Sequence, residues 1–544
     1  MCSSDLTATG QGAVTIAPSG SFSVSDPAGN DTTTAGGTDR TVTYDSVAPV
    51  ATLTQGADQV DPTNGADLVF TFTTNESVVA DSVTADDFAV SGGAINAVTG
   101  SGSTYAIAVT AAGDGTVAIA PSLAFAVEDP AGNVTTSAGG ADRSVVYDST
   151  SAVVSLEQAA GQADPAKNAA IAFTFSSSED LRSASVTTAD FDATNGTIAS
   201  VTGSGDTYTV TVTATTDGDV SIAPSGAFSV ADPGGNTTTV AGGTDRTVVY
   251  DATAPTLTLE QAAGQADPAK DATIRFTLSA SETLQTGSVT AADFTATNGT
   301  IVSVSGAGDT FTVTTTATGQ GAVELAPSNG FSVSDLAGNT RTTAAGTDRS
   351  VVYDSVAATV TLTQAAGQPD PAKDASIAFT FSSNEDLQTG SVTAADFDAA
   401  NGTVASVAGS GDAYTVTVIA TTDGAVTVAP SAGFSVLDIA GNAQTSIGGT
   451  DRTVVYDATA PSVSLQQAAS QADPAKNASI EFSFSSSEDL RSASVTAGDF
   501  AATNGAIASV TGSGDAYTVT VTATGDGTVR RSEEHTSELQ SRLH

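Results

Sequence analysis

A five-residue pattern recurs through the chain at an unvarying interval of 103 residues. Each copy has Asp at its first position, Gly at its fourth and Asn at its fifth, as in the string DPAGN. The first residues of the copies are Asp26, Asp129, Asp232, Asp335 and Asp438. A period of this length is too long for one turn of a solenoid and matches the size of an independent domain. The sequence therefore predicts a tandem array of one kind of domain.

Other landmarks keep the same interval, including a Tyr-Asp pair, an Asp-Pro pair and a single Glu. They divide the interior of the chain into four complete repeats and two partial ones. The predicted complete repeats are 46–148, 149–251, 252–354 and 355–457. Residues 7–45 are predicted to be the C-terminal part of a repeat, and residues 458–530 the N-terminal part. Residues 175–187 and 484–496 are identical strings, which indicates recent duplication.

The two ends of the chain, residues 1–6 and 531–544, resemble translated sequencing adapters. We expect both to be artefacts outside the fold, and the interior to be a piece of a longer protein. The only Cys, the only Met and both His residues lie in these ends. The interior therefore has no disulfide, no thiol metal site and no base for a nucleophilic triad, so we expect no enzymatic activity in it.

Within a repeat, hydrophobic residues alternate with Thr and Ser in short runs, as expected for strands that bury one face. In repeat 149–251 the predicted strands pass through Val154 and Leu156, 171–176, 185–193, 198–201, 208–213, 220–230 and 248–250. Asn195-Gly196 and Asp217-Gly218 are predicted to be tight turns. No helix is expected. Seven strands in about 100 residues predict an all-β immunoglobulin-like sandwich, although the Trp and Cys pair of antibody domains are missing.

The order of these landmarks resembles the bacterial Ig-like repeats of very large surface and biofilm adhesins. It runs from a linker Asp through Asp-Pro, Phe-Thr-Phe-Ser with Glu, Asp-Phe, Asn-Gly and Gly-Ser-Gly to the final Asp-x-Ala-Gly-Asn. The resemblance covers residues 7–530. It implies a stalk of abutting domains, an extracellular or cell-surface location in a bacterium, and junctions that are often stiffened by Ca²⁺. Repeats 149–251 and 355–457 depart from the pattern because they lack the linker Pro.

Sandwich topology brings the linker, the loop after the second strand and the loop before the last strand to one end of each domain. Each of these segments carries an acid, and the last also carries an Asn. Carboxylate and amide oxygens suit Ca²⁺, so we predict a structural Ca²⁺ site at each junction. The candidate ligands are Asp45, Glu76, Asp129 and Asn133; Asp148, Glu179, Asp232 and Asn236; Asp251, Glu282, Asp335 and Asn339; Asp354, Glu385, Asp438 and Asn442; and Asp457 with Glu488.

Simple turn chemistry is the alternative explanation, because Asp and Asn hydrogen-bond their own backbone in turns. The acids before Pro, Asp61, Asp164 and their equivalents, are weaker candidates for Ca²⁺. Asp86-Asp87-Phe88 and its counterparts are expected to anchor a strand end, with Phe in the core. Lys167 and its equivalents are expected to be solvated charges. The recurrent Arg residues, such as Arg246, are expected to pair locally at a sheet edge.

The formal net charge of −44 repels nucleic acid and anionic membranes. No run is long enough for a membrane span. The expected partners are neighbouring repeats of the same chain, and host or matrix glycans or proteins reached through regions outside this fragment. Two other functions stay open: a repeat module that itself binds glycan or protein, and an accessory region of an extracellular enzyme.

Overall fold

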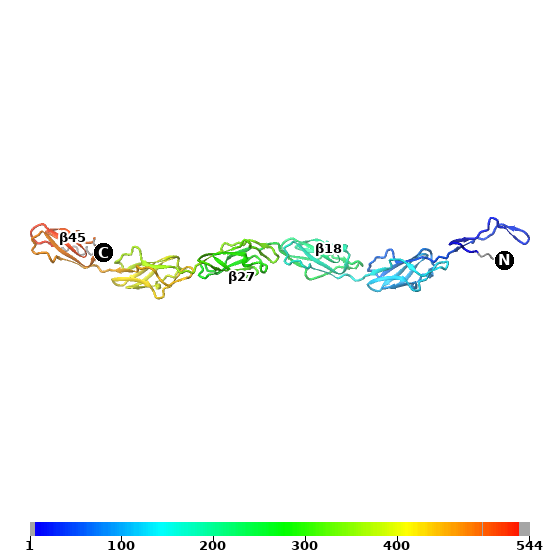
Figure 1. Ribbon diagram of the computed structural model, residues 1–544, viewed down its shortest axis with the longest axis horizontal. Helices are drawn as coiled ribbons and strands as arrows, with labels where there is room; N and C mark the ends of the chain where they lie inside the picture. The colour runs from blue at the N-terminus through cyan, green and yellow to red at the C-terminus, as the bar shows by residue number, and fades with distance from the viewer. Residues whose placement is uncertain (1–5, 492, 532–544) are drawn as a thin grey trace. The chain divides into compact units, whose positions relative to one another are not determined.

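The computed structural model describes residues 6–491 and 493–531, and they form an all-β protein. These residues fall into two compact units whose boundary lies inside repeat 252–354. Small sheets recur along the chain in both units, with β18 (Gly196–Ala214) in the first and β27 (Gly299–Ala307) in the second (Figure 1). No α-helix occurs among the described residues, as the alternating pattern predicts.

Repeat 149–251 shows the sandwich most completely. Its first sheet has the order β18-β16-β15-β22, and its second has the order β17-β19-β23. A separate two-stranded ribbon, β20-β21, carries the Asp232 loop. The bounds are β15 (Val154–Gln158), β16 (Ala170–Leu181), β17 (Phe191–Thr194), β19 (Gly218–Pro224), β20 (Val230–Ala231), β21 (Thr237–Thr238), β22 (Ala241–Gly242) and β23 (Thr247–Tyr250).

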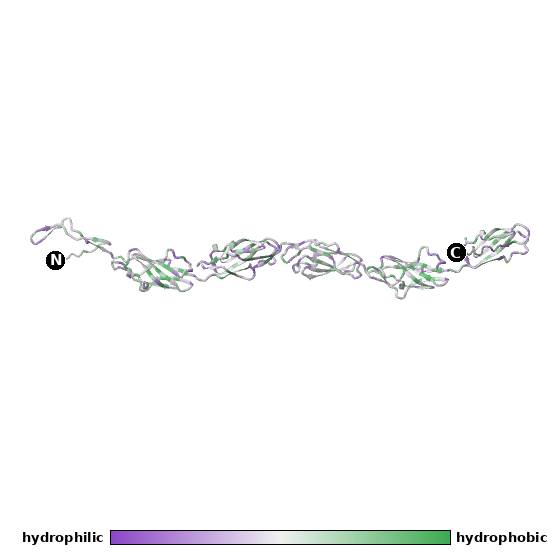
Figure 2. Ribbon diagram, turned by 180° about the vertical axis from the view of Figure 1, so that it is seen from behind, coloured by the Kyte–Doolittle hydropathy of each residue, from purple (hydrophilic) through white to green (hydrophobic). Residues whose placement is uncertain are grey.

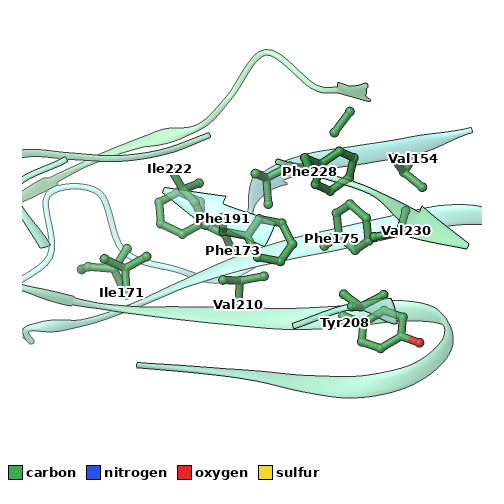
Figure 3. Close-up of a cluster of buried hydrophobic side chains, with 14 of the residues drawn as sticks. Val154, Ile171, Phe173, Phe175, Phe191, Tyr208, Val210, Ile222, Phe228 and Val230 are labelled. Atoms are coloured by element: carbon green, nitrogen blue, oxygen red, sulfur yellow. The ribbon is translucent and has the colours of Figure 1, made fainter. Parts of the chain in front are cut away.

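The core lies between these two sheets and is built from the alternate residues of each strand. Phe173, Phe175 and Val210 of the first sheet have no exposed surface, and Ile222 of the second is nearly buried (Figure 3). The Phe175 ring is 5.4 Å from that of Phe191 and meets it edge to face. Figure 2 shows the hydrophobic residues concentrated in strands and the hydrophilic ones in loops. Burial of one face of each sheet is the main stabilising term of each repeat.

The strand alternation predicted from sequence is confirmed, with one shift. The third strand begins at Phe191 and not at about residue 185. Two short 3₁₀ turns, η3 (Ser183–Ser185) and η4 (Thr188–Asp190), precede it. Thr187 and Asp190 form a reciprocal capping box around η4, in which the Asp190 side chain accepts from the backbone N–H and the hydroxyl of Thr187. This local bonding replaces strand pairing, and it anchors Phe191 in the core as expected for the Asp-Phe pairs.

The predicted tight turns are also confirmed, because Asn195 has φ 55° and Gly218 has φ 126°. The fourth and fifth predicted strands are the two arms of a hairpin. They run as the single element β18 in repeat 149–251, but as β27 and β28 (Thr310–Ala317) in repeat 252–354. The tip of β18 differs because β16 continues to Leu181, which pairs with Gly205.

The other repeats contain equivalent elements. In residues 7–45 they are β1 (Gly12–Thr15), β2 (Val24–Ser25), β3 (Asp31–Thr32) and β4 (Thr41–Tyr44). In repeat 46–148 they are β5 (Ala51–Gln55), β6 (Asp67–Thr74), η1 (Ala80–Ser82), η2 (Ala85–Asp87), β7 (Phe88–Ser91), β8 (Gly93–Ser101), β9 (Thr104–Ala111), β10 (Gly115–Pro121), β11 (Val127–Glu128), β12 (Val134–Thr135), β13 (Ala138–Gly139) and β14 (Ser144–Tyr147).

The elements of the later repeats follow the same order. In repeat 252–354 the rest are β24 (Leu257–Gln261), β25 (Thr273–Ala280), η5 (Ala291–Asp293), β26 (Phe294–Thr297), β29 (Gly321–Pro327), β30 (Val333–Ser334), β31 (Thr340–Arg341) and β32 (Ser350–Tyr353). In repeat 355–457 they are β33 (Val360–Gln364), β34 (Ser376–Ser383), η6 (Ala394–Asp396), β35 (Phe397–Ala400), β36 (Gly402–Ser410), β37 (Ala413–Ala420), β38 (Gly424–Pro430), β39 (Val436–Leu437), β40 (Ala443–Gln444) and β41 (Thr453–Tyr456). In residues 458–531 they are β42 (Val463–Gln467), β43 (Ser479–Leu490), η7 (Ala497–Asp499), β44 (Ala502–Thr503), β45 (Gly505–Ala523) and β46 (Arg530–Arg531).

The expected adapter-like ends fall mostly outside the described residues, since residues 1–5 and 532–544 are not among them.

Candidate metal centre

Carboxylates that are far apart in the sequence come together at one end of a repeat. Each set joins an Asp of the linker, a Glu that lies near the end of the second strand or just after it, and the Asp that begins the recurrent five-residue pattern. Within each set, oxygen atoms of the three carboxylates lie within 4.8 Å of one another. The complete sets within the first unit are Asp45, Glu76 and Asp129, and Asp148, Glu179 and Asp232; the set within the second unit is Asp354, Glu385 and Asp438.

The remaining candidate residues occupy the same positions. Asp251 and Asp335 approach each other in the first unit in the same way. Glu282 is half-buried and lies just after β25, at the position equivalent to Glu179, which lies inside the longer strand β16 and not in the loop expected from the sequence. Burial, followed by the nearby carboxylate of Asp457, raises the pKa of Glu488.

The Asp232 carboxylate is held by the turn that it forms. The Asp232 loop joins β20 to β21, which form a short ribbon. The short strands β21 and β22 separate this loop from the last strand, β23. Its Oδ1 accepts hydrogen bonds from the backbone N–H of Gly235 at 2.7 Å and of Asn236 at 3.0 Å. The turn chemistry expected from Asp and Asn is therefore present, but it uses only one carboxylate oxygen.

The other oxygen, Oδ2 of Asp232, is buried and has no hydrogen-bond partner, and the same holds for Oδ2 of Asp335. Both side chains are almost entirely buried, at 0% and 1% exposure. An unpaired buried carboxylate oxygen is costly because it has lost its water without gaining a donor. A cation bound at this point would remove that cost.

The Asn of the pattern connects the loop to the linker. Asn236 donates through Nδ2 to the Asp148 carbonyl oxygen at 2.9 Å, and Asn339 donates in the same way to Asp251 at 2.8 Å. Asn442 repeats this contact with Asp354 at 2.9 Å, whereas Asn133 donates to the side chain of Asp129. The amide nitrogens are thus engaged within the protein, and the amide oxygens are the side-chain atoms through which these residues could bind a metal.

Crowding of negative charge changes the acidity of the Glu residues. Burial, followed by the nearby carboxylates of Asp148 and Asp232, raises the pKa of Glu179 above its ordinary value. Burial and two neighbouring aspartates likewise raise the pKa of Glu76 and of Glu385. These directions show that three carboxylates cannot be charged together here at low cost. A divalent cation would lower the pKa of each Glu again.

The Glu385 site is accessible to solvent. An open cleft in the second unit is lined by Gln320, Tyr353, Asp354, Glu385 and Ile439. An ion could therefore reach the carboxylates without any opening of the core.

The acids before Pro have a different role from the one considered for them in the sequence. The Asp164 side chain accepts a hydrogen bond from the backbone N–H of Val249 at 2.9 Å. Asp61 accepts in the same way from Val146 at 2.8 Å, and the equivalents Asp267 and Asp370 repeat the contact. These carboxylates attach the loop after the first strand to the last strand, and none of them joins an acidic set within the described residues.

The contacts add detail to two other expectations. Lys167 is exposed, as expected, and its Nζ also donates to the Gly338 carbonyl oxygen at 3.2 Å. Arg246 pairs locally at a sheet edge, as expected. It donates from Nη2 to the Ala241 and Gly242 carbonyl oxygens at the edge strand β22. The edge location was predicted, but backbone carbonyls are its partners because they are the acceptors that lie within reach of a planar guanidinium.

No protein-family model matches the chain, and no curated protein matches it. Solved structures with similar strand arrangements include invasin, described as a bacterial integrin-binding protein, at 14% identity over 80% of this chain and 85% of that one, with a TM-score of 0.29. InvD of Yersinia pseudotuberculosis is also 14% identical, over 68% of this chain and 98% of that one, with a TM-score of 0.24. The sandwich fold itself is established by the strand pairing within the repeats.

In the described part of the chain, no helix has the length and apolar character needed to cross a bilayer.

Proposed function

We propose that this chain is a stalk segment of a large secreted or cell-surface bacterial adhesin, and that Ca²⁺ bound between successive repeats stiffens it. The role is mechanical and not catalytic. The chain would hold other regions of the same protein away from the cell surface, where they could reach host or matrix glycans or proteins.

One observation supports the cation most directly: the buried and unpartnered Oδ2 of Asp232 beside Asp148 and Glu179. The donor set consists of oxygen atoms alone, as Ca²⁺ prefers, and it comes from a linker and from the repeat that follows it. Asp148 belongs to the linker, whereas Glu179 and Asp232 belong to the repeat that follows. A cation held by all three would therefore limit the freedom of the linker.

The linkers support a stalk rather than free domains. Only six residues, 251–256, separate Tyr250, the last residue of β23, from Leu257, the first residue of β24, and they include the turn at residues 251–253. Asp251 Oδ1 accepts the backbone N–H of Thr253 at 3.0 Å, so the linker is itself structured. A short linker with internal hydrogen bonds has little of the freedom of a Gly/Ser chain.

Small-angle X-ray scattering of the full chain with Ca²⁺ and with EDTA tests the proposal. We expect the maximum dimension to decrease, and the distribution of distances to broaden, when EDTA removes the ion. Mg²⁺ is the matched control, because it tolerates a wide carboxylate site less well. An unchanged maximum dimension in EDTA would rule out Ca²⁺ stiffening, and specific hits on a glycan array would favour a binding module instead.

A further inference from the structure

The junctions of this chain differ from one another at a position outside the acidic sets. A residue in the turn after the β-hairpin of one repeat, between β18 and β19 in repeat 149–251, reaches forward and bonds to the linker that follows that repeat. In two cases this residue, which we call the clamp, is Gln, and in three it is Asp. The clamp residues are Gln11, Asp114, Asp217, Gln320 and Asp423.

The Asp clamps bond the linker through both carboxylate oxygens. Asp114 accepts the backbone N–H of Ser149 through Oδ1 at 2.8 Å, and the Thr150 hydroxyl through Oδ2. Asp217 bonds Ala252 and Thr253 in the same way, and Asp423 bonds Ala458 and Thr459. These bonds, first from the Thr150 hydroxyl and then from Ser149, hold the pKa of Asp114 below its ordinary value. The clamp is therefore charged near neutral pH.

The Gln clamps accept the same linker N–H but add a donor. Gln11 accepts from Ser46 N–H through Oε1 at 3.0 Å, and its Nε2 donates to Oδ1 of Asp45 at 3.2 Å. Gln320 accepts from Ser355 N–H at 3.1 Å and donates to the Ser355 hydroxyl at 2.8 Å. At the junction that Gln11 clamps, a protein donor is therefore already bonded to one carboxylate oxygen of Asp45, a candidate metal ligand.

Two further positions change together with the clamp. Where the clamp is Asp, the linker carries Thr and the residue before the Glu is Ser; where it is Gln, these are Val and Asn. The Asp junctions have Thr150 with Ser178, Thr253 with Ser281 and Thr459 with Ser487; the Gln junctions have Val47 with Asn75 and Val356 with Asn384. Ser178 and Asn384 each accept the same backbone N–H of the first strand region, from Val153 at 2.9 Å and Thr359 at 2.5 Å.

The carboxylate of the Asp that begins the five-residue pattern also differs between the Asp junctions and the Gln junctions. Asp232 and Asp335 belong to repeats that follow an Asp clamp, and the Oδ2 atom of each has no hydrogen-bond partner. Oδ2 of Asp129 and of Asp438, which lie beyond Gln clamps, accepts Nδ2 of Asn133 at 2.9 Å and of Asn442 at 3.0 Å. A protein donor therefore already satisfies this oxygen at the Gln junctions, whereas at the Asp junctions it is available to a cation.

We propose that the clamp residue sets the cation affinity of each junction, so that the chain holds two classes of site: tight sites behind Asp clamps and weaker sites behind Gln clamps. This inference rests on the proposed Ca²⁺ junctions. The Asp clamp adds a negative charge beside the site, and it acts on Glu179 as one of the carboxylates that raise the pKa of that residue. The pKa of Glu385, behind a Gln clamp, is raised by burial, Asp354 and Asp438.

One extra charge several ångströms from a divalent ion, in a partly hydrated site, changes affinity by roughly tenfold. The difference in Ca²⁺ affinity between the two classes of site should shrink as salt is added, because the clamp carboxylate is exposed to solvent and salt screens its charge. A tight site remains occupied at Ca²⁺ concentrations that empty a weak one. The stalk would then lose stiffness first at its Gln junctions as the Ca²⁺ concentration falls.

Calorimetric titration of the full, EDTA-treated chain with Ca²⁺ tests the proposal. We expect two classes of Ca²⁺ site whose dissociation constants differ by roughly tenfold. The triple variant Asp114→Gln, Thr150→Val, Ser178→Asn should move one site from the tight to the weak class. The reverse variant Gln320→Asp, Val356→Thr, Asn384→Ser should move one site the other way. Asp192→Gln, a change of the same charge at an exposed position of β17, should move neither.

The outcomes separate the two proposals. An absence of Ca²⁺ binding overturns the proposed junction sites and this inference with them. A single class of sites, or exchanged clamps that leave the isotherm unchanged, overturns the inference alone. The reverse variant guards against misfolding, because a gain of affinity cannot come from a damaged repeat.

Discussion

Asn236 donates its side-chain N–H to the backbone carbonyl of Asp148 at 2.9 Å, although 88 residues separate them. The bond joins the recurrent Asp-x-x-Gly-Asn loop to the linker that precedes the whole repeat. It places Asp148 beside Asp232 before any ion is bound, so the carboxylates converge because the protein holds their backbones together. The entropy of bringing these segments together is therefore lost on folding and does not weaken ion binding.

Asn236→Ala should loosen the linker. It leaves the Asp148 carbonyl without this donor, at a cost of about 1 kcal/mol. Hydrogen–deuterium exchange of the full chain should show faster exchange in residues 148–153, with the core strands unchanged. Asn168→Ala, at an exposed loop position, is the control and should leave exchange there unaltered. Equal exchange in both variants would mean that the bond does not hold the linker.

Ca²⁺ binding should weaken as the pH falls. Burial, Asp148 and Asp232 raise the pKa of Glu179 above the ordinary value of 4.5, and the ion competes with the proton that Glu179 then retains. Titration calorimetry at several pH values should show affinity declining as the pH falls through this raised pKa. The Glu179→Gln variant should bind more weakly at its own junction and lose this part of the pH dependence.

Without the ion the pH dependence of stability should have the opposite sign. A carboxyl whose pKa is raised by folding binds its proton more tightly in the folded state. Its favourable contribution is present below the raised pKa and is lost as the pH rises through it. In EDTA, repeat 149–251 should therefore become less stable as the pH rises from about 4.5 towards neutral, and Ca²⁺ should restore the loss. Thermal melting of the full chain, followed with and without EDTA, measures both trends.

Asp164→Ala should destabilise the repeat without affecting the metal site. The substitution removes the acceptor of the Val249 N–H, which costs about 0.5–1.5 kcal/mol because water can reach this exposed group. Asp164→Asn keeps an acceptor oxygen and should recover much of the loss. Limited proteolysis reports the stability and calorimetry the Ca²⁺ affinity. A fall in Ca²⁺ affinity for Asp164→Asn would identify Asp164 as a ligand, contrary to the role assigned here.

Phe175→Ala should unfold one repeat selectively. The Phe175 side chain is fully buried, and its ring contacts Phe191, Tyr208 and Phe228 at centroid distances of 5.4, 6.3 and 6.0 Å. Loss of such a ring costs about 3–5 kcal/mol, a large part of the stability of a small domain. Proteolysis should cut within repeat 149–251 first. Val153→Ala, at a residue that is 75% exposed, should leave the cleavage pattern unchanged.

The sequence was sufficient for the fold class, because alternation is a local property. Phe173 and Phe175 point to one face and Thr174 to the other whatever the rest of the chain does. The third strand was misplaced for the same reason. Its residues look extended in sequence, but the Asp190 carboxylate bonds Thr187 locally and turns the backbone first. The contact of Lys167 could not be predicted because its acceptor, the Gly338 carbonyl, belongs to the next repeat.

The candidate site was likewise determined in part by the sequence and in part by the tertiary structure. By itself the sequence determined that each repeat is a sandwich, and that its linker Asp, its Glu and its patterned Asp belong to one end, since strand order fixes which loops share an end. Only the tertiary structure decided which oxygen of Asp232 makes the turn and which is left buried without a partner. It alone showed that Asp114 and Gln11 bond the linker differently. Such contacts join residues many positions apart, and hydrogen-bond geometry depends on distances that no local pattern encodes.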